Sequence, residues 1–258
     1  MTDDIKSIEK EAHRLLEERQ YQEAAKLFCR VAGSYKEGGQ HQQAALCFAF
    51  TASCWALKAG EKTFYNAATM YEQAALEAES ARNFEYASLM YKHAAICYER
   101  DLEYLGFSEC FYRSKECYRK FLKLSLFNAG KTKNMSETTQ KHFLKEWARR
   151  FISWCFLTFS YILWGHGERP QRTIIFGCSL ILGFALLYTC GFVKTSQAVI
   201  RPNILEAIYF SAITFTTVGY GDILPLGLNK AFATIEAFSG LFIAPVFITG
   251  LCRKYLRF

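Results

Sequence analysis

A run of hydroxyl-bearing and small residues, Thr216-Thr217-Val218-Gly219-Tyr220-Gly221-Asp222, is suited to binding a cation through oxygen atoms. Gly219 and Gly221 permit left-handed backbone angles, so successive carbonyl groups can turn toward one axis. The hydroxyl of Thr217 adds a further oxygen at one end of the run. Oxygen atoms arranged in this way can replace the water around an ion.

The elements around this run predict its surroundings. Residues 174–193 carry no charge, and residues 231–252 carry only Glu236, so each segment is long and apolar enough to cross a bilayer. The segment between them is apolar enough to enter a membrane, but it is too short and too rich in glycine to cross the membrane twice. Bare backbone at membrane depth survives only when protein buries it or when it lines water. Two spans around a half-buried loop therefore predict a pore.

Placed between two spans, the run resembles the signature filter of the potassium channels. The resemblance implies a homotetramer in the bilayer that conducts K⁺ passively, with no cofactor other than the permeant ion. It also implies that backbone carbonyls and the Thr217 hydroxyl hold K⁺, and that Thr216 and Asp222 support the filter. The ion-binding residues would be Thr217, Val218, Gly219, Tyr220 and Gly221.

We expect a pore domain over residues 171–258, in which Pro202 and Asn203 mark the start of the pore helix. Its expected parts are a first span at 173–193, a pore helix at 203–216, a filter at 217–222 and a second span at 230–252.

The second span contains two candidate gating positions. Gly240 matches the inner-helix hinge glycine of the family, and Pro245 removes a backbone hydrogen bond and so adds a second weak point. The alternative is that both residues merely allow close helix packing. Helical spacing from Gly240 makes Leu241, Ala244 and Ile248 the expected cavity lining.

The chain departs from well-known family members behind the filter. Tyr209-Phe210 stands where those members often carry two tryptophans, and Phe210 cannot donate a hydrogen bond to the filter tyrosine. Ile213 replaces a carboxylate found in some members. These changes bear on the rigidity of the filter rather than on its preference for potassium. Glu236 is a candidate for polar support from the second span, and the alternative places it near the outer water.

The first half of the chain repeats a helical pattern. Similar segments begin at Tyr21, His41, Phe64, Phe84 and Phe107. The first four carry a small residue three positions later and an aromatic residue seven positions later, a spacing that lets helices pack closely. Residues 1–128 therefore resemble the tetratricopeptide class, in its longer soluble-attachment-protein (SNAP) variety, and the predicted fold is all-α.

The connection between the two halves divides into two predicted parts. Residues 129–146 are mostly polar and are expected to form a linker. Residues 147–170 contain a short uncharged run from Phe151 to Trp164. The segment also carries Trp147, Trp154, Tyr161 and Trp164, aromatic residues that favour the headgroup region. An interfacial amphipathic helix is expected there, and a true membrane span is the alternative.

Other functions find no support in the residues. The histidines show no metal-binding spacing, and neither a phosphate-binding loop nor a nucleophile motif occurs, so we expect no catalytic residue and no enzyme. The first half is nearly neutral, which argues against nucleic acid. Its cysteines lack CxxC pairs and indicate reduced thiols in the cytosol.

These patterns predict a potassium channel subunit in the cell membrane that crosses it more than once. Basic residues flank the two spans on the sides of the termini more often than they occur in the intervening loop, so both termini are expected in the cytoplasm. The repeats would bind an unidentified cytosolic protein or ligand that gates the pore. The alternatives are a poorly selective cation pore and a membrane-anchored adaptor with a non-conducting pore.

Overall fold

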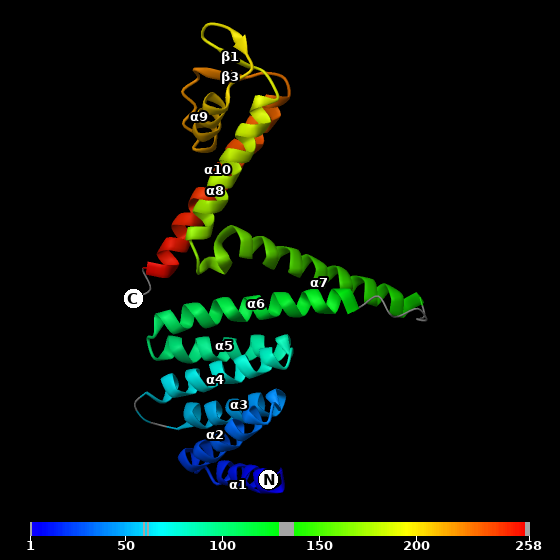
Figure 1. Ribbon diagram of the computed structural model, residues 1–258, viewed down its shortest axis with the longest axis vertical. Helices are drawn as coiled ribbons and strands as arrows, with labels where there is room; N and C mark the ends of the chain where they lie inside the picture. Colours follow the sequence, from blue (N-terminus) through cyan, green and yellow to red (C-terminus); the bar gives the residue numbers. More distant parts are fainter. Residues whose placement is uncertain (1, 59, 61, 129–136, 256–258) are drawn as a thin grey trace. The chain divides into compact units, whose positions relative to one another are not determined.

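A computed structural model describes residues 2–58, 60, 62–128 and 137–255 of the chain. The chain forms two compact units, residues 1–158 and 159–258, and each is described by itself (Figure 1). Helices account for most of the described residues, which confirms the predicted all-α class.

The N-terminal unit contains a series of helices in which each helix packs against the next one along the chain (Figure 1). Helices begin at Tyr21, His41 and Phe84, as the repeated pattern predicts, and one residue before the predicted Phe64. The series comprises α1 (Thr2–Glu17), α2 (Tyr21–Glu37), α3 (His41–Leu57), α4 (Thr63–Ser80), α5 (Phe84–Arg100) and α6 (Tyr104–Asn128).

The repeated small residues form the centre of this packing. Ala24, Ala44, Ala67 and Ala87 are completely buried. Because alanine lacks a long side chain, neighbouring helices approach closely at these positions, and large aromatic side chains such as Phe28 fill the adjacent space. The predicted alternation of small and large residues therefore builds the core, whereas membership of the tetratricopeptide class stays a prediction.

Four of the helix connections share one backbone geometry. After α1, the residue Arg19 adopts a left-handed φ of 61°. The N–H of Arg19 donates to the Leu16 carbonyl at 3.1 Å, and the N–H of Gln20 donates to the Leu15 carbonyl at 2.9 Å. This pair of bonds is a Schellman motif, which satisfies the last carbonyls of a helix. The same bonds recur at the turns whose left-handed residues are Gly39, Arg82 and Leu102.

The predicted connection between the halves is wrong in two respects. Helix α7 (Glu137–Trp164) begins inside the expected linker 129–146, so residues 137–146 are helical, while 129–136 lie outside the described residues. The expected interfacial helix 147–170 is not one helix, because α7 ends at Trp164 and a 3₁₀ turn, η2 (Gly165–Gly167), follows. Left-handed backbone angles at Gly165, His166 and Gly167 end the helical path there.

After the end of α7 and the turn η2, the C-terminal unit contains three helices and a small antiparallel sheet with strand order β2-β1-β3. The expected span 173–193 is longer than the helix found there. Val193 pairs with Ile200 and Pro225 in the sheet and does not continue the helix. The elements are α8 (Gln171–Thr189), β1 (Val193–Thr195), β2 (Val199–Ile200), α9 (Ile204–Phe215), β3 (Ile223–Pro225) and α10 (Leu228–Tyr255).

Helices α8 and α10 run beside each other, and α9 packs against both (Figure 1). Both α8 and α10 are long and apolar enough to cross a membrane. The core between the three helices contains Tyr188, Ala207, Phe210 and Ile213. Asn229, which is 1 % exposed, joins the start of α10 to the end of α8 by donating to the Tyr188 carbonyl at 3.5 Å, and it donates to the Phe192 carbonyl just beyond α8 at 3.2 Å.

Candidate functional site

The short helix α9 begins with a reciprocal cap. The Asn203 side chain accepts a hydrogen bond from the Glu206 N–H at 2.9 Å, and the Glu206 carboxylate accepts one from the Asn203 N–H at 2.9 Å. This capping box satisfies two backbone donors that the first turn of a helix leaves free. The start signal read at Pro202-Asn203 is thereby confirmed.

The same helix ends directly in the glycine-containing loop. Thr217 adopts a left-handed φ of 58°, and its N–H donates to the Thr214 carbonyl at 3.0 Å. The Ile213 carbonyl accepts the N–H groups of Val218 at 3.0 Å and Gly219 at 3.2 Å. The first part of the loop is therefore a Schellman cap of α9, and the helix fixes its backbone.

These bonds also determine which way the loop carbonyls face. In a trans peptide unit the C=O points opposite to the N–H, and the described residues contain no cis peptide. Since the N–H groups of Thr217, Val218 and Gly219 point at α9, the carbonyls of Thr216, Thr217 and Val218 point away from it. Gly219 and Gly221 have φ values of 51° and 78°, which confirms the left-handed angles expected of both.

The side of the loop away from α9 is open in the single chain. The exposed fraction is 52 % for Val218 and 73 % for Tyr220. At the far end of the loop, the Tyr209 hydroxyl donates to a carboxylate oxygen of Asp222 at 2.8 Å. Tyr209 therefore ties α9 to the last residue of the run, so the helix holds the loop at both ends.

Phe210 and Ile213 lie behind the loop in the apolar core. Phe210 is 4 % exposed, and its ring meets that of Tyr188 edge to face with centroids 4.8 Å apart. Apolar packing thus occupies the positions where the potassium channels that the loop resembles were expected to carry polar groups. The role predicted for Phe210 as a filter support stays a prediction.

Glu236 is fully buried and contacts polar groups on the two other helices of the unit. Tyr188 on α8 donates to one carboxyl oxygen at 2.6 Å, and the Ser211 hydroxyl on α9 forms a hydrogen bond with the other. Ser211 also donates to the Ile181 carbonyl at 2.8 Å. The alternative that placed Glu236 near the outer water does not fit this burial. Sequence reasoning missed Tyr188 and Ser211.

Gly240 lies where α10 crosses the end of α9. A Cβ atom at this position would overlap the Phe215 carbonyl oxygen. Helix α10 is continuous from Leu228 to Tyr255 with Pro245 inside it, so this conformation has a close approach at Gly240 and no break. The geometry favours the close-packing alternative, and a hinge at Gly240 or Pro245 stays a prediction.

The predicted cavity-lining residues Leu241, Ala244 and Ile248 are exposed in the single chain. Leu241 and Ile248 are each 59 % exposed on α10. Their side chains are therefore accessible to any molecule that lies beside this helix. Their contact with an ion path stays a prediction.

The end of α10 far from α9 carries an ion pair. Arg253 lies 3.2 Å from the carboxylate of Glu168, whose side chain is 1 % exposed. Gly167, with a left-handed φ of 89°, lies beside the Arg253 guanidinium, where a side chain would come within 3.2 Å. Pro170 packs on Gly250 of the same helix end. The turn after α7 and the last turns of α10 are therefore joined.

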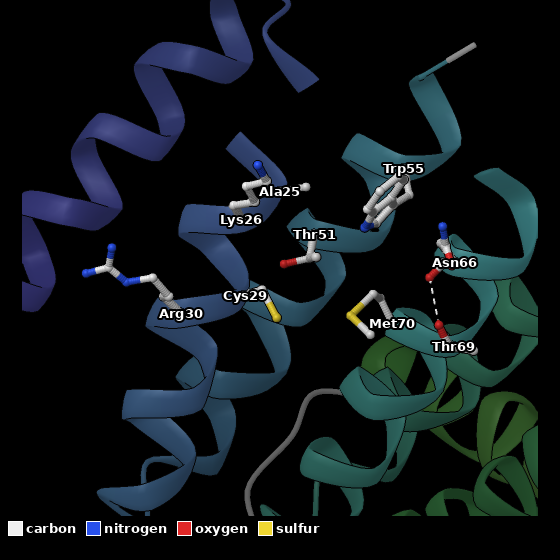
Figure 2. Close-up of a pocket in the computed structure, with 9 residues that line it drawn as sticks. All are labelled: Ala25, Lys26, Cys29, Arg30, Thr51, Trp55, Asn66, Thr69 and Met70. Atoms are coloured by element: carbon white, nitrogen blue, oxygen red, sulfur yellow. Dashed lines mark hydrogen bonds between the residues drawn. The ribbon is translucent and has the colours of Figure 1, made fainter. Parts of the chain in front are cut away.

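A separate groove of about 680 Å³ lies in the N-terminal unit (Figure 2). Lys26 and Arg30 on α2 are its charged lining residues, and Trp55 on α3 and Met70 on α4 supply apolar surface. The remaining lining residues are Ala25, Cys29, Thr51, Asn66 and Thr69. This is a candidate surface for a partner of the helical unit.

Comparison with known proteins agrees with the geometry of the C-terminal unit. Residues 174–257 match the sequence model of a family described as ion channel. The chain is 30 % identical over 82 residues to Protein LctB of Bacillus caldotenax, and 32 % identical over 81 residues to Protein LctB of Geobacillus stearothermophilus. Each match covers 28 % of this chain and 60 % of the relative. No solved structure matches the chain.

The C-terminal unit is therefore a two-span ion-channel domain, which follows a series of packed helices. A membrane location follows from the same match and from the two apolar helices.

Proposed function

We propose that the protein is a subunit of a potassium-selective channel in which four copies surround one pore. The observation that carries this proposal is the loop from Thr216 to Asp222, whose first N–H groups bond to α9 while the carbonyls of Thr216, Thr217 and Val218 point away from it. One chain supplies one strip of oxygens, and a ring around K⁺ requires several chains about an axis. Of the predicted ion-binding residues, Thr217 and Val218 contribute carbonyl oxygens to this strip.

The exposed surfaces of the single chain support assembly. Val218 and Tyr220 in the loop and Phe238 and Leu241 on α10 are large apolar residues that are more than half exposed. A subunit that lies in a membrane can expose apolar residues to lipid, but exposed filter residues need an aqueous or protein neighbour. Four-fold assembly places them at the axis.

The basic residues support a topology in which both termini are cytoplasmic. Arg169 precedes α8, Arg172 lies in its first turn, and Arg253 and Lys254 lie in the last turn of α10, whereas the loop between the helices carries fewer basic residues. In this orientation the helical N-terminal unit is cytosolic. Its groove near Lys26 and Arg30 supports a cytosolic protein or ligand as the regulator of opening.

The test is electrical measurement on the purified full chain in liposomes. Under opposing K⁺ and Na⁺ gradients, the reversal potential is expected to follow the K⁺ gradient. Gly219→Ala and Tyr220→Ala are expected to abolish selective flux while the subunits still assemble. The reason at Gly219 is conformational, because its left-handed angle disfavours an L side chain although no atom lies within 4 Å of an added Cβ.

Three other results would contradict the proposal or the assignment of the filter. A reversal potential that ignores the K⁺ gradient indicates a poorly selective cation pore and contradicts the proposal. The absence of current under every condition favours the membrane-anchored adaptor. Wild-type selectivity in Gly219→Ala contradicts the assignment of the filter.

A further inference from the structure

One buried polar cluster joins the three helices of the channel domain. It consists of Tyr188 on α8, Ser211 on α9 and Glu236 on α10, each of which is 0 % exposed. We call these three residues the brace. An ionisable side chain inside a membrane segment is costly, and proteins keep one where it has a role. The bonds of Glu236 to both other helices indicate what that role is.

The brace does not itself touch the ion path. Glu236 has no exposed surface even in the single chain, where the filter loop is open. Its effect must therefore pass through α9, the helix that holds the loop. Ser211 lies on α9 two residues before Ile213, whose carbonyl accepts the N–H groups of Val218 and Gly219. A shift of α9 at Ser211 moves the support of the filter with it.

Tyr188, the brace residue on α8, acts on the opposite end of the loop. The ring of Tyr188 packs on Phe210, with ring centroids 4.8 Å apart. Phe210 adjoins Tyr209, which donates to Asp222 at 2.8 Å. The brace therefore supports the part of α9 from which both ends of the loop are held.

The hydrogen bonds of Ser211 indicate the form of the carboxyl group. A hydroxyl has one proton to donate, and Ser211 has two acceptors in reach, the Ile181 carbonyl and Glu236. If the Ser211 hydroxyl donates its one proton to the Ile181 carbonyl, it can only accept a hydrogen bond from Glu236. The proton of that second hydrogen bond then belongs to a neutral Glu236 carboxyl group. Every polar atom of the brace then has a partner, which burial at this depth requires.

We propose that Glu236, with Tyr188 and Ser211, is a positioning residue for the filter, and this inference rests on the proposed function. The brace sets the position of α9 and thereby the spacing of the filter carbonyls. Its loss is expected to change which ions pass and how long conduction persists. If the Glu236 carboxyl group is neutral and donates to Ser211, an amide can take its place.

The experiment compares Glu236→Leu with Glu236→Gln in the full-length protein in liposomes. Leucine removes both hydrogen bonds, and the expected result is an increase of about tenfold in Na⁺ relative to K⁺ permeability, with faster decay of current. Glutamine keeps an oxygen for Tyr188 and offers an N–H to Ser211, so it is expected to retain wild-type behaviour. Tyr188→Phe and Ser211→Ala each remove one oxygen and are expected to give smaller changes.

Matched controls separate positioning from folding. Ser179→Ala removes a hydroxyl from an exposed position of α8, where it donates only to its own helix, and is expected to change nothing. Assembly is measured by cross-linking in every variant. If Glu236→Leu fails to assemble, Tyr188→Phe and Ser211→Ala provide the same test with smaller perturbations.

The outcomes are distinct. If assembled Glu236→Leu, Tyr188→Phe and Ser211→Ala keep the wild-type permeability ratio and current decay, the brace is only structural and the inference is overturned. If Glu236→Gln behaves like Glu236→Leu, the neutral-carboxyl account is wrong. If the wild-type protein shows no K⁺ selectivity, the proposed function is contradicted, and the inference, which rests on it, is overturned with it.

Discussion

Single backbone positions decide how the channel domain fits together. Gly240 is one such position, because the Phe215 carbonyl at the end of α9 occupies the space that a side chain would need. Phe215 also places its ring against Gly177 of α8, 3.5 Å from where a Cβ would lie. Gly240 therefore makes room for the Phe215 backbone, whereas a Cβ at Gly177 would meet the Phe215 ring at an ordinary contact distance. This close approach explains a glycine at residue 240 without a hinge.

We therefore expect Gly240→Ala to displace α9 and to abolish selective conduction. A methyl group at this position meets backbone, which cannot move aside as a flexible side chain can. Ion selectivity in liposomes and assembly by cross-linking are the measurements. Gly183→Ala on α8, where no atom lies within 4 Å, is the matched control. An alanine variant that alters only opening and closing, with normal selectivity, would instead support the hinge.

At the scale of elements, one buried carboxylate joins three helices of the N-terminal unit. Glu77 on α4 is 4 % exposed and lies 2.9 Å from Lys36 of α2 and 2.8 Å from His41 of α3. Burial alone raises the pKa of Glu77, but the hydrogen bonds from His41 and Lys36 outweigh it, so the net pKa is lowered. The ionised form therefore stabilises the fold.

Glu77→Gln is expected to destabilise the packing of α2, α3 and α4 by about 1–3 kcal/mol. A lowered pKa means that this contribution is complete above the ordinary glutamate pKa of about 4.3 and is lost as the pH falls through the lowered value. Backbone hydrogen exchange of these helices, measured against pH, tests both points. Glu85→Gln, on an exposed position of α5, is the control. Equal protection in Glu77→Gln and the wild type at neutral pH would contradict the expectation.

A second contact between elements bears on opening. The Glu168–Arg253 pair joins the turn after α7 to the last turns of α10, and Glu168 is 3 % exposed. If opening requires the end of α10 to move, as in the proposed channel, this pair must stretch or break. Glu168→Gln is then expected to raise the open probability about fivefold or more.

Single-channel recording of Glu168→Gln measures this effect, and Lys254→Gln, one residue from Arg253, is the control. Exchanging the charges in the double variant Glu168→Arg, Arg253→Glu is expected to bring the open probability back toward the wild-type value. An open probability that Glu168→Gln leaves unchanged would show that the pair does not restrain opening.

The sequence predicts the elements better than their contacts. Periodic alanines and aromatics predict the starts of most helices of the first unit, and Asn203 with Glu206 predicts the start of α9. The turns at Arg19 and Leu102 are not predictable in this way, because arginine and leucine do not favour left-handed angles as glycine does. The contacts of the brace cannot be predicted from the sequence either, because Tyr188 and Glu236 lie on different helices and meet only through tertiary packing. The apolar character of Glu236's surroundings is the available signal, because such a carboxylate needs a partner.

At the scale of the whole molecule, helices α1 to α6 are proposed to control the pore through residues 129–164. A flexible Gly/Ser insertion after Asn134 is expected to remove the response of open probability to cytosolic partners and to leave K⁺ selectivity intact. Coupling of about 1–3 kcal/mol, typical of allostery, corresponds to about 5- to 150-fold in the closed-to-open ratio. Recording with and without the insertion tests this.

The same Gly/Ser stretch appended after Phe258 is the control for the insertion. Selectivity measured in both variants reports on the pore, and open probability reports on the coupling. A response that survives the insertion after Asn134 would make the helical unit a tether or an assembly aid.

The brace is complete within one chain, whereas the ring of filter carbonyls requires several. Each newly inserted subunit can therefore position its pore helix before it meets another subunit. Assembly then joins subunits that are already folded. A subunit with a damaged brace still presents its docking surfaces, so it is expected to enter mixed tetramers with normal subunits. In the proposed tetramer, one misplaced strip of oxygens would then disturb a ring to which every subunit contributes, so a minority of defective subunits is expected to impair most channels.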